Sequence, residues 1–294
     1  MKINNITLHS VFLVITLSLL HVLPAHSADD PDWQGKLEAS PSYIDAKRTR
    51  DGSAPAHRDK HHKIYSSRGV DTSRPQQLNK QELRDIDGYT DAPDSYDIGS
   101  GENDPVHPRA NRNVKSFNRG LEDLPAIEDD IYSAQIFTLG EDGSVLVEEG
   151  DYIVNAFRPW SFTDNPDSAV LFIRKKLGGP AGQRVVIYQV DQSMNGKIIS
   201  PISTIEKEAE VAYRAGSQFR VSSINNIALQ EGEQITSIKL TEVDSIPAGS
   251  KIYDNKVNRA PLTEAQIERV PEEYRIRVRD EDEVTGAAAC SIDS

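Results

Sequence analysis

Residues 196–221, GKIISPISTIEKEAEVAYRAGSQFRV, decide how the chain folds. Apolar and aromatic residues stand at alternate positions on either side of a turn at Gly216: Val211, Tyr213, Phe219 and Val221. This pattern predicts an antiparallel pair of strands preceded by a polar loop. Two glutamates, Glu208 and Glu210, stand two residues apart where the first strand begins. Because successive side chains of a strand alternate between its faces, both carboxylates are expected on the same face.

On spacing alone, the two glutamates fit the solvated outer face of a β-hairpin, where like charges cost little. The whole string, however, resembles the mono-ADP-ribosyltransferase family of secreted toxins and effectors. In that family a strand ending in G-x-x-I is followed by a Ser-containing loop, then by E-x-E-V, a short Gly turn and F-x-V. The matching residues here are Gly196 to Ile199, Ser200 to Thr204, Glu208 to Val211, Gly216, and Phe219 to Val221.

The resemblance implies a role for each glutamate. Glu210 matches the catalytic glutamate, which hydrogen-bonds the ribose of NAD and stabilises the oxocarbenium-like charge that forms as nicotinamide departs. Glu208 matches the residue that, in the arginine-modifying branch, orients and deprotonates the acceptor guanidinium, a group that otherwise stays protonated. The resemblance therefore implies NAD as a substrate and, as partner, a target protein that bears an acceptor arginine.

A second motif of the family is a Ser-Thr-Ser-like stretch at the end of a strand, whose first serine braces the catalytic glutamate beneath the nicotinamide. The matching stretch here is residues 160–164, WSFTD, which precede a predicted helix at residues 168–177. The resemblance assigns Ser161 to the first serine and places Ser161 and Thr163 at the NAD. Phe162 departs from the usual small middle residue, and the aspartate after Thr163 departs as well. The alternative interpretation is a surface turn with a helix cap.

The family's third element is an arginine, usually after a tyrosine on a strand, which holds the NAD phosphates through bidentate hydrogen bonds. One alignment puts this position after Tyr132, where the chain has Ser133. A second alignment, with the cholera- and pertussis-like toxins, matches Tyr65 and Arg68 ahead of the Asp-Thr-Ser-Arg-Pro run at residues 71–75. The alternative for Arg68 is an ordinary solvated side chain.

Residues 1–27 predict a secretory signal peptide, with an early lysine, an apolar run and a small-residue cleavage site. The apolar run covers residues 11–23, and a membrane-spanning helix needs about 20 residues. We therefore expect a secreted protein without a membrane span. The formal net charge of −13 argues against nucleic acid as a partner. The single cysteine, Cys290, allows no internal disulfide.

Residues 28–112 are rich in polar residues and poor in large apolar ones, which predicts a largely irregular leader. From residue 113 onward strand patterns dominate. They predict an α+β domain at residues 113–279. The resemblance implies that this is the catalytic domain, with a mixed, ADP-ribosyltransferase-like β-sandwich core and flanking helices. Residues 280–294 are expected to be a disordered tail. A histidine-rich run at residues 57–62, HRDKHH, is expected to be solvated and to bind no metal.

The leading hypothesis is a secreted, NAD-dependent mono-ADP-ribosyltransferase, a glycosyltransferase of toxin or effector type that modifies arginine in a target protein. One alternative is a catalytically inactive relative that keeps the fold for binding, because Ser133 stands where an arginine is expected. The other alternative is an unrelated, exported, β-rich interaction protein, which would fit the generic strand pattern and the polar leader.

Overall fold

The computed structural model describes residues 31–72, 78–90, 108–141, 143–179, 181–203, 205–255 and 260–279. The expected signal peptide, the expected tail and Cys290 lie outside these residues. The helices are α1 (Trp33–Ala39), α2 (Tyr43–Ser67), α3 (Lys80–Thr90), α5 (Pro108–Glu122), α6 (Pro166–Lys176) and α7 (Glu264–Glu268). The strands are β1 (Ile131–Thr138), β2 (Tyr152–Val154), β3 (Trp160–Thr163), β4 (Gln183–Val190), β5 (Lys197–Ile198), β6 (Glu210–Tyr213), β7 (Gln218–Ala228), β8 (Gln234–Glu242), β9 (Ile246–Pro247), β10 (Ile252–Asp254) and β11 (Val278–Arg279).

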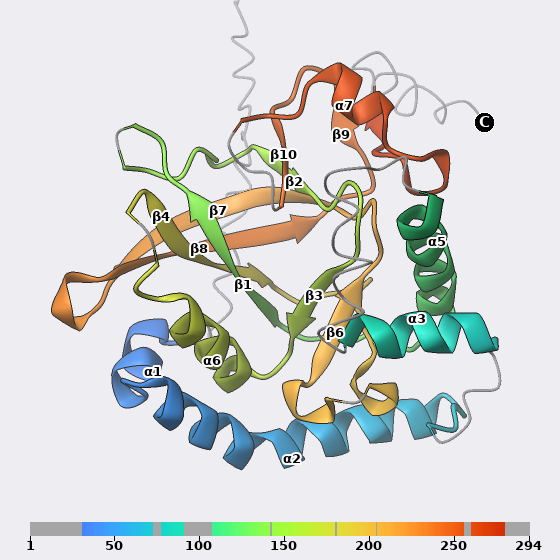
Figure 1. The fold of residues 1–294 in the computed structure, drawn as a ribbon, viewed down its shortest axis with the longest axis horizontal. Coiled ribbons are helices and arrows are strands. Elements are labelled where there is room, and N and C mark those ends of the chain that lie inside the picture. Colours follow the sequence, from blue (N-terminus) through green and yellow to red (C-terminus); the bar gives the residue numbers. More distant parts are fainter. Residues whose placement is uncertain are drawn as a thin grey trace, which may run out of the picture. The chain divides into compact units, whose positions relative to one another are not determined.

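Nine strands form one mixed sheet that curls on itself, in the order β10-β2-β7-β8-β4-β1-β3-β6-β5 (Figure 1). The sheet turns over at β1. This strand pairs along its whole length with β4, but it meets β3 through the single pair Tyr132 and Thr163. Strands β3, β6 and β5 therefore form a second layer against the first. The predicted α+β class, with a mixed sheet and flanking helices, is confirmed.

A cluster of buried aromatic side chains fills the space between the two layers: Trp160, Phe162, Tyr188, Tyr213 and Phe219. Trp160 contacts Phe162 and Tyr188, with ring centroids 4.8 Å apart in both pairs. Such contacts add about 0.5–1.5 kcal/mol per pair beyond the area that they bury. The cluster also explains why a phenylalanine stands in the Ser161 stretch. Phe162 packs into the core, so Ser161 and Thr163 on either side of it face away from the core.

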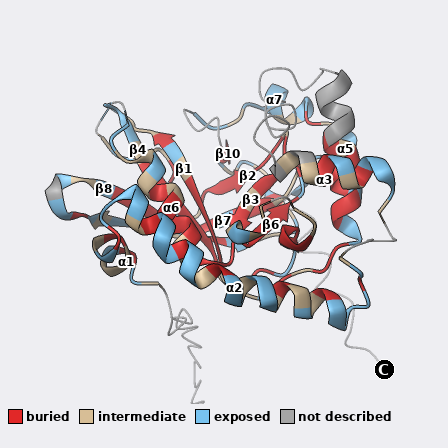
Figure 2. Ribbon diagram, turned by 60° about the horizontal axis from the view of Figure 1, so that its bottom comes forward, coloured by how far each residue is buried: buried red, intermediate tan, exposed pale blue. Residues whose placement is uncertain are grey.

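The predicted irregular leader is wrong for the part of it that the structure describes, because residues 33–39, 43–67 and 80–90 are helical. Figure 2 shows buried and exposed residues alternating along α2. Its buried stripe has helical spacing, yet it is made of small, polar and aromatic side chains: Ala46, Arg50, Ala54, His61 and Tyr65. An apolar count overlooks such a helix, because ion pairs and hydrogen bonds hold its buried face.

The N-terminal helices are tied to the sheet and to α6. The Trp33 ring lies edge-on to Tyr132, with centroids 5.0 Å apart. Lys36 Nζ lies 2.9 Å from Asp167 at the start of α6, and Arg174 near its end donates to backbone carbonyls of the last turn and the C-cap of α1. Within the described ranges, no helix combines the length and the apolar character that crossing a membrane requires.

Candidate functional site

Glu210 and Ser161 meet across two neighbouring strands. Glu210 is the first residue of β6, and the antiparallel register pairs it with Thr163 on β3. Ser161 lies two residues earlier on the same face of β3. Its hydroxyl donates to Glu210 Oε1 at 2.5 Å. The structure therefore brings together two residues that the sequence motifs placed in one site.

The Glu210 carboxyl group is buried, with 5% of the residue exposed. Its pKa is raised to about 8, mainly because a charge is poorly solvated there, and the neighbouring charge of Glu208 contributes to the rise. The hydrogen bond from Ser161 acts in the opposite direction, since it favours the ionised form. A carboxyl group with such a strongly perturbed pKa marks this position as a candidate functional site.

The raised pKa of Glu210 has a consequence for the stability of the folded protein. A group with a raised folded-state pKa contributes stability that is present below its unfolded pKa and lost as the pH rises through its folded pKa. For Glu210 the loss falls between its usual value of 4.5 and about 8. Glu210→Gln does not titrate, so its free energy of unfolding should exceed that of wild type by up to roughly 5 kcal/mol at pH 9. Urea unfolding at pH 5 and pH 9 measures this difference, and an equal effect at both values would contradict it.

Glu208 lies close to Glu210, but the two residues are not related by strand alternation. It ends a short 3-10 turn, η3 (Glu206–Glu208), and Ala209 has left-handed dihedral angles of φ 50° and ψ 48°. The two glutamates are therefore not alternate residues of one strand, and the same-face argument is wrong. Thr163 Oγ1 donates to the Glu208 carbonyl at 2.6 Å and holds this turn against β3.

The Glu208 side chain is half-buried beside α2 and α6. Burial raises the pKa of its carboxyl group, and the positive charges of Arg50 on α2 and Lys175 on α6 partly oppose the rise. A carboxylate with a raised pKa is a better proton acceptor near neutral pH. Thr163 engages the backbone of Glu208, so its hydroxyl positions the turn.

The two arginine alignments fall on different elements, α2 and the strand β1. Tyr65 lies on α2, and its hydroxyl donates to the Ile198 carbonyl at 2.6 Å. Arg68 caps the C-terminal end of α2 with an exposed side chain, and its charge contributes to lowering the pKa of Lys197, after burial as the main cause. In the other alignment, Ser133 is buried and accepts a hydrogen bond from Trp160 Nε1 at 3.1 Å.

Tyr89 of α3 is a site neighbour that the sequence did not indicate. Its ring packs on Phe117, with centroids 4.7 Å apart. Burial raises the pKa of its hydroxyl, the charge of Glu210 raises it further, and the charge of Arg158 lowers it. Tyr89 thus lies within electrostatic reach of both groups. Arg158 itself is buried, 3.3 Å from Asp254. No local pattern in α3 could have placed Tyr89 beside a strand so distant along the chain.

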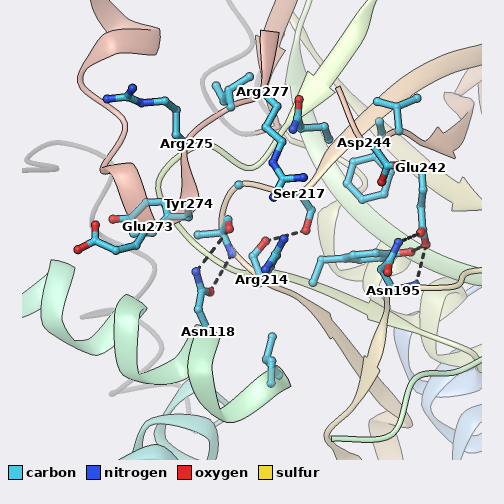
Figure 3. Close-up of a pocket in the computed structure, with 18 of the residues that line it drawn as sticks. Asn118, Asn195, Arg214, Ser217, Glu242, Asp244, Glu273, Tyr274, Arg275 and Arg277 are labelled. Atoms are coloured by element: carbon cyan, nitrogen blue, oxygen red, sulfur yellow. Dashed lines mark hydrogen bonds between the residues drawn. The ribbon is translucent and has the colours of Figure 1, made fainter. Parts of the chain in front are cut away.

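A cavity of about 700 Å³ lies at the other end of β6, between α5, the β6–β7 turn and residues 272–278 (Figure 3). Several of its charged and polar side chains satisfy each other. Arg214 lies 3.8 Å from Glu122, Arg275 lies 2.6 Å from Glu272, and Glu242 accepts hydrogen bonds from the backbone of Asn195. Glu210 and Ser161 do not line this cavity, so it is separate from their site.

Comparisons with known proteins give a fold. No protein-family model and no curated protein sequence matches the chain. Among solved structures, the chain is similar to the ADP-ribosyltransferase Vis, a toxin from Vibrio splendidus. The structure of Vis in complex with agmatine matches with a TM-score of 0.54 and 18% sequence identity, and the match covers 74% of this chain and 95% of Vis. Vis in complex with M6 inhibitor matches with a TM-score of 0.54 and 16% identity, over 74% and 94%. The chain therefore has the ADP-ribosyltransferase fold.

Proposed function

We propose that the protein is a NAD-dependent mono-ADP-ribosyltransferase, exported as a toxin or effector, that transfers ADP-ribose to arginine of a target protein. The observation that carries the proposal is the hydrogen bond of 2.5 Å from Ser161 to the buried Glu210. It lies in a fold shared with Vis, at the residues that the sequence motifs select. Export rests on the expected signal peptide at residues 1–27 of the sequence.

The chemistry follows from the placement of Glu210. When the bond between the ribose anomeric carbon and nicotinamide breaks, positive charge grows on the sugar. A carboxylate held in a poorly solvated site stabilises that charge more strongly than it would in water. Ser161 fixes the carboxylate and favours its ionised form, so it prepares the charge that the transition state needs.

The choice of arginine rests on Glu208. An acceptor guanidinium must lose a proton as one of its nitrogens bonds to the anomeric carbon, and it needs a base close to the reacting atoms. Glu208 lies near enough to Glu210 to raise the pKa of that group, and its own pKa is raised by burial. Vis has been crystallised with agmatine, a guanidinium compound, which supports the same acceptor chemistry here.

Labelled NAD tests the proposal directly. The protein from residue 28 onward is incubated with NAD labelled in its ADP-ribose part, first with agmatine and then with a cell lysate. Label on agmatine and on a lysate protein is the expected result. NAD binding without turnover would support the alternative of an inactive relative. That alternative rests on Ser133, which stands where the family has an arginine and is buried in a hydrogen bond with Trp160. A protein that neither binds nor cleaves NAD would overturn the proposal.

Ser161→Ala is expected to change the pH dependence of the reaction. The Ser161 hydrogen bond lowers the pKa of Glu210, so its loss should move the rising limb of the rate profile to higher pH. At pH 7 turnover should fall about tenfold, because less of the carboxyl group is ionised. At pH 9 part of the loss should be recovered. Ser168→Ala, which removes a buried hydroxyl without a hydrogen-bond partner, is the matched control. A pH-independent loss in Ser161→Ala would contradict this role.

A further inference from the structure

Three buried side chains form a continuous chain from β3 through α2 to the loop before β6. Asp164 follows directly after β3, and its Oδ2 lies 3.1 Å from Nε2 of His61 on α2. The other ring nitrogen of His61, Nδ1, lies 2.5 Å from the Ser200 hydroxyl. Ser200 begins the short 3-10 turn η2 (Ser200–Ile202). Figure 1 shows this loop lying along α2.

The arrangement has the residue types of a hydrolase triad, but burial rules out that chemistry. A nucleophilic serine must be reached by its substrate. Ser200 is 1% exposed and His61 is 0% exposed, and the Asp164 side chain is likewise inaccessible. This chain of contacts is therefore structural in its direct effect.

The charges of this chain are well compensated. Asp164 also lies 2.9 Å from Lys60 Nζ and 3.1 Å from His57 Nδ1. These positive and polar neighbours outweigh its burial and hold the pKa of its carboxyl group well below the usual range. The ionised Asp164 can only accept, and it lies 3.1 Å from Nε2 of His61, which favours the tautomer with its proton on Nε2. A neutral ring then accepts at Nδ1 from the Ser200 hydroxyl, and a protonated ring donates to it.

The chain fixes both ends of one loop. At its start, His61 holds Ser200, and Tyr65, one helical turn further along α2, donates to the Ile198 carbonyl. At its end, the backbone NH of Asp164 donates to the Ala209 carbonyl at 3.4 Å. Between these points lies Glu208. Glu210, in contrast, is held by strand pairing and by Ser161.

We propose that the Asp164–His61–Ser200 chain is a positioning device, by which α2 fixes the two 3-10 turns at residues 200–202 and 206–208 and so sets where Glu208 lies relative to Glu210. The functional part of this inference rests on the proposed transferase activity. His61 and Ser200 act through the loop and touch no reacting atom. Their loss should therefore affect the acceptor step and leave Glu210 in place.

The hold of α2 on this loop through His61 and Ser200, the α2 clamp, can be measured without NAD. In Ser200→Ala and His61→Ala, amide hydrogen exchange should speed up by at least about tenfold for residues 200–209 through local opening, while β6 keeps its protection. Ser168→Ala on α6, a buried hydroxyl without a hydrogen-bond partner, is the control and should change neither segment. Unchanged exchange of residues 200–209 in Ser200→Ala would overturn the inference, whether or not the protein is an enzyme.

Kinetics then test the consequence. In Ser200→Ala, kcat/KM for agmatine should fall about tenfold or more, because misplacing a catalytic group by a fraction of an ångström is costly. NAD hydrolysis should stay within about twofold, since Glu210 keeps its place. A general loss of folding would lower both rates together and leave their ratio unchanged, and that result would overturn the positioning role. A wild-type protein that does not cleave NAD would refute the proposed function, and the exchange experiment would still decide the clamp.

Discussion

Replacing Glu210 with glutamine is expected to lower the turnover of NAD by about a hundredfold or more, which corresponds to roughly 2.7 kcal/mol of transition-state stabilisation. Glutamine keeps the size of the side chain and an oxygen that can accept from Ser161, whose hydroxyl now lies 2.5 Å from Oε1. It removes the negative charge that would oppose the positive charge on the ribose. Both transfer to agmatine and hydrolysis by water should be lost, because both pass through the same charged sugar.

Ground-state binding separates this role from a simple contact with NAD. The affinity for NAD, measured by calorimetry, should differ little between wild type and Glu210→Gln, since the substrate carries no positive charge at the anomeric carbon. A rise in the dissociation constant that accounts for the whole loss would assign Glu210 to substrate binding. An unaltered rate would remove the enzymatic interpretation of this site. Glu242→Gln, at the cavity at the other end of β6, is a matched control and should leave turnover unchanged.

The parts of the site that the sequence predicted are those set by local pattern. Alternating apolar residues on either side of Gly216 predicted the strands β6 and β7. A serine two residues before Thr163 was assigned beside Glu210, and the register of β3 and β6 brings them into contact. Strand periodicity and a short motif carry this information, because both act over a few residues.

The parts that the sequence did not predict depend on distant contacts or on a single backbone angle. Strand alternation placed Glu208 on β6, but the left-handed conformation of Ala209 separates Glu208 from the strand, which begins only at Glu210. The histidine run on α2 was interpreted as solvated. His61 is instead fully buried. The sequence could not show this burial, because the partners Asp164 and Ser200 lie more than a hundred residues away in the chain. A count of apolar residues does not reveal a buried polar helix face, because such residues are buried only where partners compensate them.

Glu208→Gln is expected to separate the two reactions that Glu210→Gln loses together. If Glu208 takes the proton of the acceptor guanidinium, the glutamine variant should lose about a hundredfold or more in transfer to agmatine. Hydrolysis of NAD to free ADP-ribose should remain within a few-fold of wild type, because water needs no guanidinium base. Parallel assays of labelled agmatine and of free ADP-ribose measure both rates in one sample.

Glu206→Gln is the matched control, because Glu206 lies in the same 3-10 turn as Glu208 and faces His62 at 3.9 Å. It should leave both rates near wild type if the position of the carboxylate matters and the charge of the turn as a whole does not. The expected division of roles no longer depends on alternation along a strand. It depends on Thr163 and the α2 clamp holding the Glu208 turn, while β6 and Ser161 hold Glu210. An equal loss of transfer and hydrolysis in Glu208→Gln would show that the two carboxylates act as one unit, and the proposed arginine specificity would then lose its support in the site.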